Sequence, residues 1–93
     1  MQFLIVARDG TDPDAEIRRR HARPEHSALV QAMKSNGTFR VGGHTLDHAG
    51  NIIGSAMIVE FANQEAFDEY LSKEPYATSG VWKQIEVTRI NLG

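Results

Sequence analysis

Apolar residues in the first third of the chain follow two patterns: a continuous run, and then a repeat with the period of an α-helix. Phe3–Ala7 (FLIVA) is a short apolar run that ends in the turn signal Asp9-Gly10, as a buried strand does. A stripe at i, i+3, i+4 and i+7, which would face a core, follows at His26, Leu29, Val30 and Met33. Asn36-Gly37 then predicts a left-handed cap at the end of this helix.

Two prolines shape the start of that helix. Asp12 before Pro13 predicts a helix start, with an acid as N-cap and proline at the first helical position. The residue before a proline is pushed out of the α region. Pro24 therefore predicts that the charged segment 13–22 ends and that the helix begins again at residue 24.

A β-hairpin follows. Residues 38–47 predict a strand weakened by Gly42-Gly43, where a bulge or a close approach of another backbone is expected. The segment HAGN (48–51) predicts the hairpin turn, and IIGSAMIVEF (52–61) predicts the returning strand.

The remaining segment predicts one more helix and one more strand. Asn63 would cap a helix whose apolar stripe consists of Ala66, Phe67, Tyr70 and Leu71. The last strand is expected from about 82 to 92, and its apolar positions change parity near Thr88, which indicates a bulge there.

The predicted order is β-α-β-β-α-β, an α+β fold of the ferredoxin-like, split βαβ type with a four-stranded antiparallel sheet and both helices on one face. The first and third strands, which carry the continuous apolar runs, would be central. A strand that is apolar on both sides needs cover on both faces. We therefore expect a homodimer in which two sheets pack face to face.

Composition and charge narrow the possible functions. The 93 residues predict a single domain (1–93) with 41% apolar and 24% charged residues. A net charge of −2 argues against general attraction to nucleic acid or to an anionic membrane. With no cysteine there is no disulfide, redox thiol or thiolate metal site. The first apolar run is too short for a signal or membrane segment, so we expect a cytoplasmic protein.

Two polar features favour ordinary interpretations. The basic run RRRHAR (18–23) is flanked by acids and contains no aromatic residue, so a solvated helix face is favoured over a nucleic-acid site. The four histidines do not share an evident face with a carboxylate that would complete a metal triad, so no metal site is expected.

Four short motifs carry a resemblance to a known family. In chain order they are RPEHSAL (23–29), VGG (41–43), GSAMIVEF (54–61) and KEPYATSGVW (73–82). Together they resemble the YCII-related family of small bacterial proteins along essentially the whole chain. The resemblance implies a ferredoxin-like fold of the dimeric α/β-barrel type. Relatives of that type include muconolactone isomerase-like enzymes and dehydrochlorinases that act on small oxidised rings.

The resemblance also implies site residues. The family pattern has a histidine after Arg-Pro in the first helix, here His26, and an aspartate before Pro-Tyr, where this chain has Glu74. These two positions are read in the family as a His–Asp active-site dyad. The family's Gly-Ser at the start of the third strand matches Gly54-Ser55. Glutamate is one methylene longer than aspartate, which changes the reach of the carboxylate.

The residues themselves leave alternatives open. His26 is either a half-buried helix residue or a general acid or base, since imidazole exchanges protons near neutrality. Glu74 either stabilises the start of the short turn after Pro75 or orients His26. Tyr76 and Trp82 are core or interface aromatics, or one of them forms the wall of a ligand pocket.

Two functions follow. The first is a small enzyme of lyase or isomerase type that transfers a proton, without a cofactor, on a small anionic cyclic or enolisable substrate. His26 and Glu74 would be catalytic, and Arg8, Ser55 and Tyr76 would bind the substrate. The alternative is a non-catalytic dimeric domain that binds a small ligand or a protein, because a fold alone does not imply a function.

Overall fold

The predicted order of strands and helices is present, with one short additional helix after the second long one. The computed structural model describes residues 1–93. Its elements are β1 (Gln2–Asp9), α1 (Ala15–Asn36), β2 (Phe39–Leu46), β3 (Ile52–Glu60), α2 (Gln64–Lys73), α3 (Pro75–Thr78) and β4 (Trp82–Ile90).

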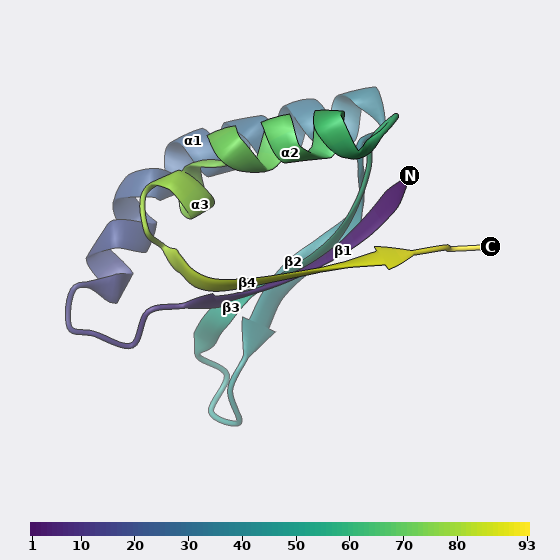
Figure 1. Ribbon diagram of the computed structural model, residues 1–93. Helices are drawn as coiled ribbons and strands as arrows, with labels where there is room; N and C mark the ends of the chain where they lie inside the picture. The colour runs from purple at the N-terminus through teal and green to yellow at the C-terminus, as the bar shows by residue number, and fades with distance from the viewer.

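The four strands form one antiparallel sheet in the order β2-β3-β1-β4. The prediction that the first and third strands are central is therefore confirmed. Both long helices lie on the same face of the sheet, and α3 lies beyond the end of α2 (Figure 1). This is the ferredoxin-like α+β arrangement.

The core lies between this helical layer and the sheet. Alternate residues of β1 (Phe3, Ile5 and Ala7) are buried beneath the helices, as a strand with period two requires. The ring of Phe3 stacks on that of Phe67 of α2, with centroids 4.1 Å apart. Asn63 caps α2 as predicted, because its side-chain oxygen accepts a hydrogen bond from Ala66 N at 2.8 Å.

The prediction of a break at Pro24 is wrong, since α1 is a single helix from Ala15 to Asn36 that passes through this proline. Proline removes one helical hydrogen bond, the one to the carbonyl four residues earlier. Pro24 is exposed, so water can satisfy that carbonyl. Ala22 and Met33, buried on either side, hold both halves of the helix against the sheet.

The predicted start of α1 is displaced by two residues. Asp14 occupies the N-cap position, and its side chain makes no capping hydrogen bond. The Asp12 carboxylate lies before the helix, where it accepts hydrogen bonds from both terminal nitrogens of Arg18, at 2.6 and 2.8 Å, and from Asp14 N at 3.3 Å. At the other end Gly37 adopts φ +84°, which confirms the predicted left-handed cap.

The irregularities of the sheet also differ in position. In β2 the register shifts at Arg40, before the glycine pair, and again after Thr45. In β4 the shift lies next to Trp82, and pairing is regular through Thr88, so the bulge predicted at Thr88 is wrong. Ile85 and Val87 therefore face the helical side and Ile90 the opposite side.

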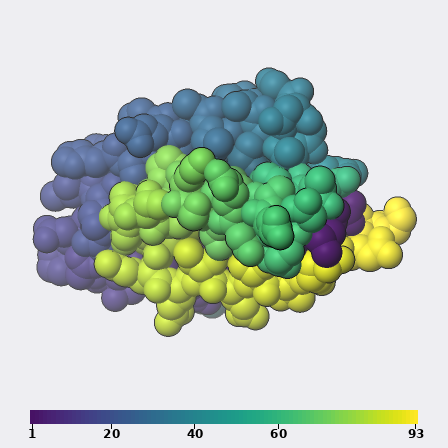
Figure 2. All heavy atoms as spheres, turned by 45° about the horizontal axis from the view of Figure 1, so that its top comes forward, coloured from purple at the N-terminus to yellow at the C-terminus, as the bar shows by residue number.

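Ile85 and Val87 stay partly exposed although they face the helices, because they lie on the edge strand β4. Atoms of β4 are visible along the margin of α2 and α3, which cover the central strands more fully than this edge strand (Figure 2). The opposite face of the sheet has no helix at all (Figure 1). Its central part carries apolar side chains, including Val6, which is 38% exposed.

Candidate functional site

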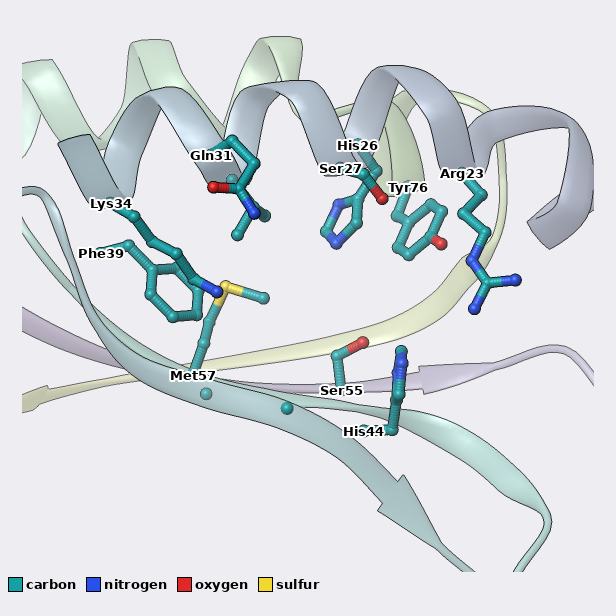
Figure 3. A pocket seen from close by; sticks show the side chains of 13 residues that line it. Arg23, His26, Ser27, Gln31, Lys34, Phe39, His44, Ser55, Met57 and Tyr76 are labelled. Carbon is teal, nitrogen blue, oxygen red and sulfur yellow. The ribbon is translucent and has the colours of Figure 1, made fainter.

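A cavity of about 260 Å³ opens between α1 and the β2–β3 side of the sheet. Helix α1 supplies the upper wall, β2 and β3 supply the lower wall, and Tyr76 of α3 closes one end (Figure 3). The residues that line it are Arg23, His26, Ser27, Val30, Gln31, Lys34, Phe39, Gly42, Gly43, His44, Ser55, Met57 and Tyr76.

Two glycines line this cavity. Gly42 faces Met57 so closely that an added Cβ would lie 2.6 Å from the Met57 Cβ, whereas a Cβ on Gly43 would meet nothing within 4 Å. The close backbone approach predicted for this pair therefore holds at Gly42. Gly42 pairs with Met57 on the helical face of the sheet, so the lack of a side chain at Gly42 leaves space on the floor of the cavity beneath α1.

His26 and Glu74 meet at the inner end of this cavity. His26 Nδ1 lies 2.7 Å from Glu74 Oε1, although the two residues are 48 positions apart. The His26 side chain is 13% exposed and that of Glu74 is completely buried. The structure therefore brings together the two residues that the sequence singled out, and the extra methylene of glutamate does not prevent their contact.

The local sequence holds Glu74 in place. Glu74 is the last residue before α3, with Pro75 in the first turn, and its Oε1 accepts a hydrogen bond from Tyr76 N at 2.9 Å. The hydroxyl of Tyr70 donates to its Oε2 at 3.5 Å. Burial, together with the nearby Glu74 carboxylate, raises the pKa of Tyr70, which keeps this hydroxyl protonated as a donor. Glu74 therefore both caps α3 and faces His26.

The hydrogen-bond partners determine the tautomer of His26. Glu74 Oε1 accepts a hydrogen bond from Tyr76 N, and Oε2 accepts one from Tyr70 Oη. The carboxylate therefore acts as an acceptor through both oxygens. His26 Nδ1 must then carry the hydrogen in the 2.7 Å contact. The other ring nitrogen, Nε2, makes no hydrogen bond within the chain and is left with a lone pair. The imidazole points from α1 toward the sheet (Figure 3).

Aromatic rings fix the plane of this imidazole. The ring of Tyr76 stacks on His26 with centroids 3.8 Å apart and an angle of 9° between the planes. Trp82 packs edge-on against both rings, at 6.1 Å from His26 and 5.8 Å from Tyr76. Tyr76 and Trp82 are thus core residues, as the simpler interpretation held, and Tyr76 is also a wall of the cavity. They do not fill it.

A second polar cluster borders the cavity where β1 ends. Asp9 accepts two hydrogen bonds from Arg19, at 2.7 and 3.3 Å, and both side chains are mostly buried. The Arg19 guanidinium also lies over the Tyr76 ring, 4.8 Å from its centroid. One of its nitrogens, Nη1, is 3.5 Å from His44 Nδ1.

The cavity is electropositive at both ends. Arg23 and Lys34 line it, and neither forms a salt bridge with a carboxylate of the chain. Lys34 instead lies over the ring of Phe39, 5.4 Å from its centroid. No carboxylate belongs to the lining, and the two behind it, Glu74 and Asp9, are paired with His26 and Arg19. The exposed charges of the cavity therefore favour an anionic ligand.

The predicted ligand-binding residues divide into two groups. Ser55 and Tyr76 line the cavity. Arg8 does not: it follows the buried Ala7 in β1, so its side chain leaves the sheet on the opposite, uncovered face. Its place near the end of the strand suggested proximity to the site, but the parity of the strand directs it away from His26. Within a single chain, the structure therefore does not bring Arg8 together with His26, Ser55 and Tyr76.

Sequence reasoning missed the basic residues of the site. Arg18 and Arg20 are paired with Asp12 and Glu16 on the solvent side, as expected for a solvated helix face. Arg19 and Arg23, however, belong to the same helix stripe as His26, at i, i+4 and i+7. That spacing was the available signal, and an unbroken helix through Pro24 is needed to read it.

His44 was also missed as part of the cavity. The sequence pattern suggests it only as a possible metal ligand together with His48.

No group of three His, Asp or Glu side chains is arranged to hold a metal ion. None of the helices combines the length and apolar character needed to cross a membrane.

The fold and this cavity define a class: a small ferredoxin-like α+β domain with a buried histidine–carboxylate pair at the end of an electropositive pocket. The chain belongs to the YCII-related domain family, whose model matches residues 1–91. Protein YciI of Escherichia coli O6:H1 (strain CFT073) is 29% identical over 93 residues, which cover 94% of this chain and 93% of that protein.

Two solved structures share the fold. One is the 5-chloro-2-hydroxyhydroquinone dehydrochlorinase TftG of Burkholderia phenoliruptrix AC1100 in complex with 2,5-dihydroxybenzoquinone. It matches with a TM-score of 0.82 and 23% sequence identity, and the match covers 100% of this chain and 96% of that one. The other is a dimeric ferredoxin-like protein of unknown function from Jannaschia sp. CCS1, with a TM-score of 0.53 and 12% identity over 98% of each chain.

Proposed function

We propose that this protein is a small cytoplasmic enzyme that transfers a proton, without a cofactor, on a small anionic cyclic or enolisable substrate. The observation that carries this proposal is the 2.7 Å hydrogen bond between His26 Nδ1 and the buried Glu74 carboxylate. A carboxylate on one ring nitrogen leaves the other as the base, and it stabilises the imidazolium that forms when that base takes a proton.

The proposed reaction uses His26 twice. Its Nε2 takes a proton from one atom of the substrate and returns it to another, or to a leaving group, so that the enzyme ends in its starting state. Glu74 orients the ring through its hydrogen bond to Nδ1. Stacking on Tyr76 supports the same orientation, because it prevents the imidazole from turning out of the plane that Glu74 requires.

The lining of the cavity supports an anionic substrate. Arg23 and Lys34 supply positive charge without competing carboxylates, and Ser55 supplies a hydroxyl that makes no hydrogen bond within the chain. A volume of about 260 Å³ suits a single small ring or a short chain. The complex of TftG with 2,5-dihydroxybenzoquinone suggests a hydroxyquinone as the first probe.

The test combines binding with proton exchange. Wild-type protein and His26→Asn are mixed with 2,5-dihydroxybenzoquinone, and a rise in melting temperature reports binding. In D₂O, loss of the ring-proton NMR signal of the quinone reports proton transfer at carbon. We expect exchange to fall by about 100-fold or more in His26→Asn, since a general acid–base group typically contributes 10²–10⁴-fold.

A matched control is available in His48, which lies in the β2–β3 turn away from the cavity. His48→Asn should exchange the quinone at the wild-type rate. If the quinone binds and exchanges equally well in wild type and His26→Asn, the catalytic proposal is wrong. Binding without any accelerated exchange would instead favour the alternative of a ligand-binding domain.

We further propose that the protein is a homodimer formed through the uncovered face of the sheet. This face carries apolar side chains on its central strands, and the neighbour from Jannaschia is described as dimeric. Val6→Lys would place a charge in the centre of that interface, at a position that is 38% exposed in the single chain. Light scattering after size exclusion should find a dimer for wild type and a monomer for Val6→Lys. A wild-type monomer at micromolar concentration would refute this.

A further inference from the structure

The floor of the cavity, opposite His26, is formed by two polar residues on adjacent strands. His44 of β2 pairs with Ser55 of β3 in the register of the sheet, so both side chains rise from the same face. Figure 3 shows both directed toward the helical layer, below His26 and Tyr76. Ser55 is only 4% exposed, and its hydroxyl makes no hydrogen bond within the chain. A hydroxyl that has no partner in the chain and faces the cavity is available for a ligand.

The neighbours of His44 determine which of its nitrogens carries the hydrogen. Arg19 Nη1 lies 3.5 Å from His44 Nδ1. A guanidinium has only donors, so His44 Nδ1 must be the acceptor of this contact and the hydrogen must be on Nε2. Arg19 cannot turn away easily, because Asp9 holds it by two hydrogen bonds and it lies over the Tyr76 ring.

His44 is also held in its neutral form. Partial burial, followed by the positive charges of Arg19 and Arg23, lowers its pKa below the ordinary value of 6.5, and His26 acts in the same direction with a smaller effect. Asp9 acts in the opposite direction with a smaller effect. At neutral pH His44 is therefore an uncharged imidazole.

The two histidines of the cavity are thus prepared in opposite ways. A carboxylate holds the hydrogen of His26 on Nδ1 and leaves a lone pair on Nε2. A guanidinium at Nδ1 of His44 leaves its hydrogen on Nε2. One ring can accept a proton and the other can donate a hydrogen bond. This contrast is visible only once the partners of both rings are known.

We propose that His44 Nε2–H and the Ser55 hydroxyl together bind the substrate oxygen on which negative charge develops when His26 takes a proton. The inference rests on the proposed function and deepens it, because it assigns the substrate class: a carbonyl compound that reacts through an enolate. Neutral donors aimed at such an oxygen are an effective form of transition-state stabilisation. Arg19 is a positioning residue that acts through His44.

The step balances without another reactant. His26 Nε2 takes the proton of a C–H bond next to the carbonyl, and the electron pair of that bond forms a C=C bond as the carbonyl oxygen becomes an enolate oxygen. His44 and Ser55 donate hydrogen bonds to that oxygen but keep their protons. The imidazolium of His26 then returns its proton to another atom of the enolate, which restores the enzyme and gives an isomer.

The decisive experiment reads the tautomers directly and needs no substrate. Long-range ¹H–¹⁵N NMR spectra of the free protein at neutral pH distinguish the two neutral forms of each imidazole, and single-histidine substitutions assign the signals. We expect the Nδ1–H form for His26 and the Nε2–H form for His44. A His44 that is charged, or that carries its hydrogen on Nδ1, would overturn the inference whatever the result for His26.

A pair of substitutions then tests the donor role. His44→Gln retains an N–H group at about the position of Nε2, whereas His44→Val removes it. Ionised 2,5-dihydroxybenzoquinone is itself an enolate, so its affinity is the readout. We expect a loss of about tenfold in His44→Val, the size of one lost hydrogen bond to a charged group, and retention within about threefold in His44→Gln. Equal affinity of wild type and His44→Val would overturn the donor role.

The two proposals fail in distinguishable ways. If wild-type protein does not bind the quinone, the hydroxyquinone of the proposed function is wrong, whereas the tautomer of His44 is still read directly from the free protein. If the quinone exchanges its proton through His26 but the His44 tautomer is Nδ1–H, the proposed function survives and the role of His44 is lost.

Discussion

Replacing His26 by phenylalanine removes one hydrogen-bond donor from a buried carboxylate and keeps an aromatic ring in the stack with Tyr76. In the native protein Glu74 is completely buried and its Oε1 accepts hydrogen bonds from His26 Nδ1 at 2.7 Å and from Tyr76 N at 2.9 Å. After the change only the backbone donor and the more distant Tyr70 hydroxyl, at 3.5 Å, remain.

The expected cost follows from that burial. Removing the donor of a hydrogen bond to a buried charged group typically destabilises a protein by about 1.5–3 kcal/mol, because the charge loses a partner that water does not replace. The Glu74 side chain is completely buried, so we expect the upper end of this range, about 3 kcal/mol. For a chain of this size that corresponds to a fall in melting temperature of roughly 12–24 °C.

A double-mutant cycle separates this hydrogen bond from the packing of the ring. Glu74→Gln keeps the size of the side chain but removes its charge, and we expect a loss of about 1–2 kcal/mol because a neutral acceptor is weaker. When His26→Phe is combined with Glu74→Gln, it should cost only about 1 kcal/mol more than Glu74→Gln alone, which gives a coupling of about 2 kcal/mol between the two positions.

The assay is urea and thermal unfolding of the four proteins at one protein concentration, since self-association would shift the melting temperature. A coupling below about 0.5 kcal/mol, the usual error of additivity, would refute the argument that His26 compensates the buried charge of Glu74. In that event Glu74 would act chiefly as the cap of α3.

Three further predictions use other parts of the fold. Gly54→Ala should destabilise the protein by more than about 2 kcal/mol, because the new Cβ would lie 2.0 Å from a carbonyl oxygen of β1. In Gly43→Ala the new Cβ meets nothing within 4 Å, so stability should change by less than about 1 kcal/mol. Urea unfolding of the two variants measures the difference. Pro24→Ala should stabilise the protein by about 1–3 kcal/mol by restoring a helical hydrogen bond, and an unchanged or lower melting temperature would contradict this. The lowered pKa of His44 means that the unfolded chain binds a proton first as the pH falls below 6.5, so stability is lost in that range. Wild type should therefore lose more stability than His44→Gln between pH 7 and pH 5, and equal losses would contradict the lowered pKa.

Much of the fold could be predicted from local patterns. The continuous run at Phe3–Ala7 and the helix stripe that ends at Gly37 each reflect a periodicity that one element imposes on its own residues. The order of these elements then leaves few antiparallel arrangements, so the central position of the first and third strands followed. Errors arose where tertiary contacts outweigh a local preference, as at Pro24, which buried neighbours on both sides keep within the helix.

The sequence by itself also determined the identities of His26 and Glu74, through motifs that resemble the YCII-related family. Only the tertiary structure decided that they touch, because their separation of 48 residues is closed by the packing of α1 against α3. The contacts of α1 with Glu74 and with β2 determined which nitrogen of each histidine carries the hydrogen, and strand parity turned Arg8 away from the cavity. Hydrogen-bond partners and the direction of a side chain depend on neighbours distant in sequence, which no local pattern specifies.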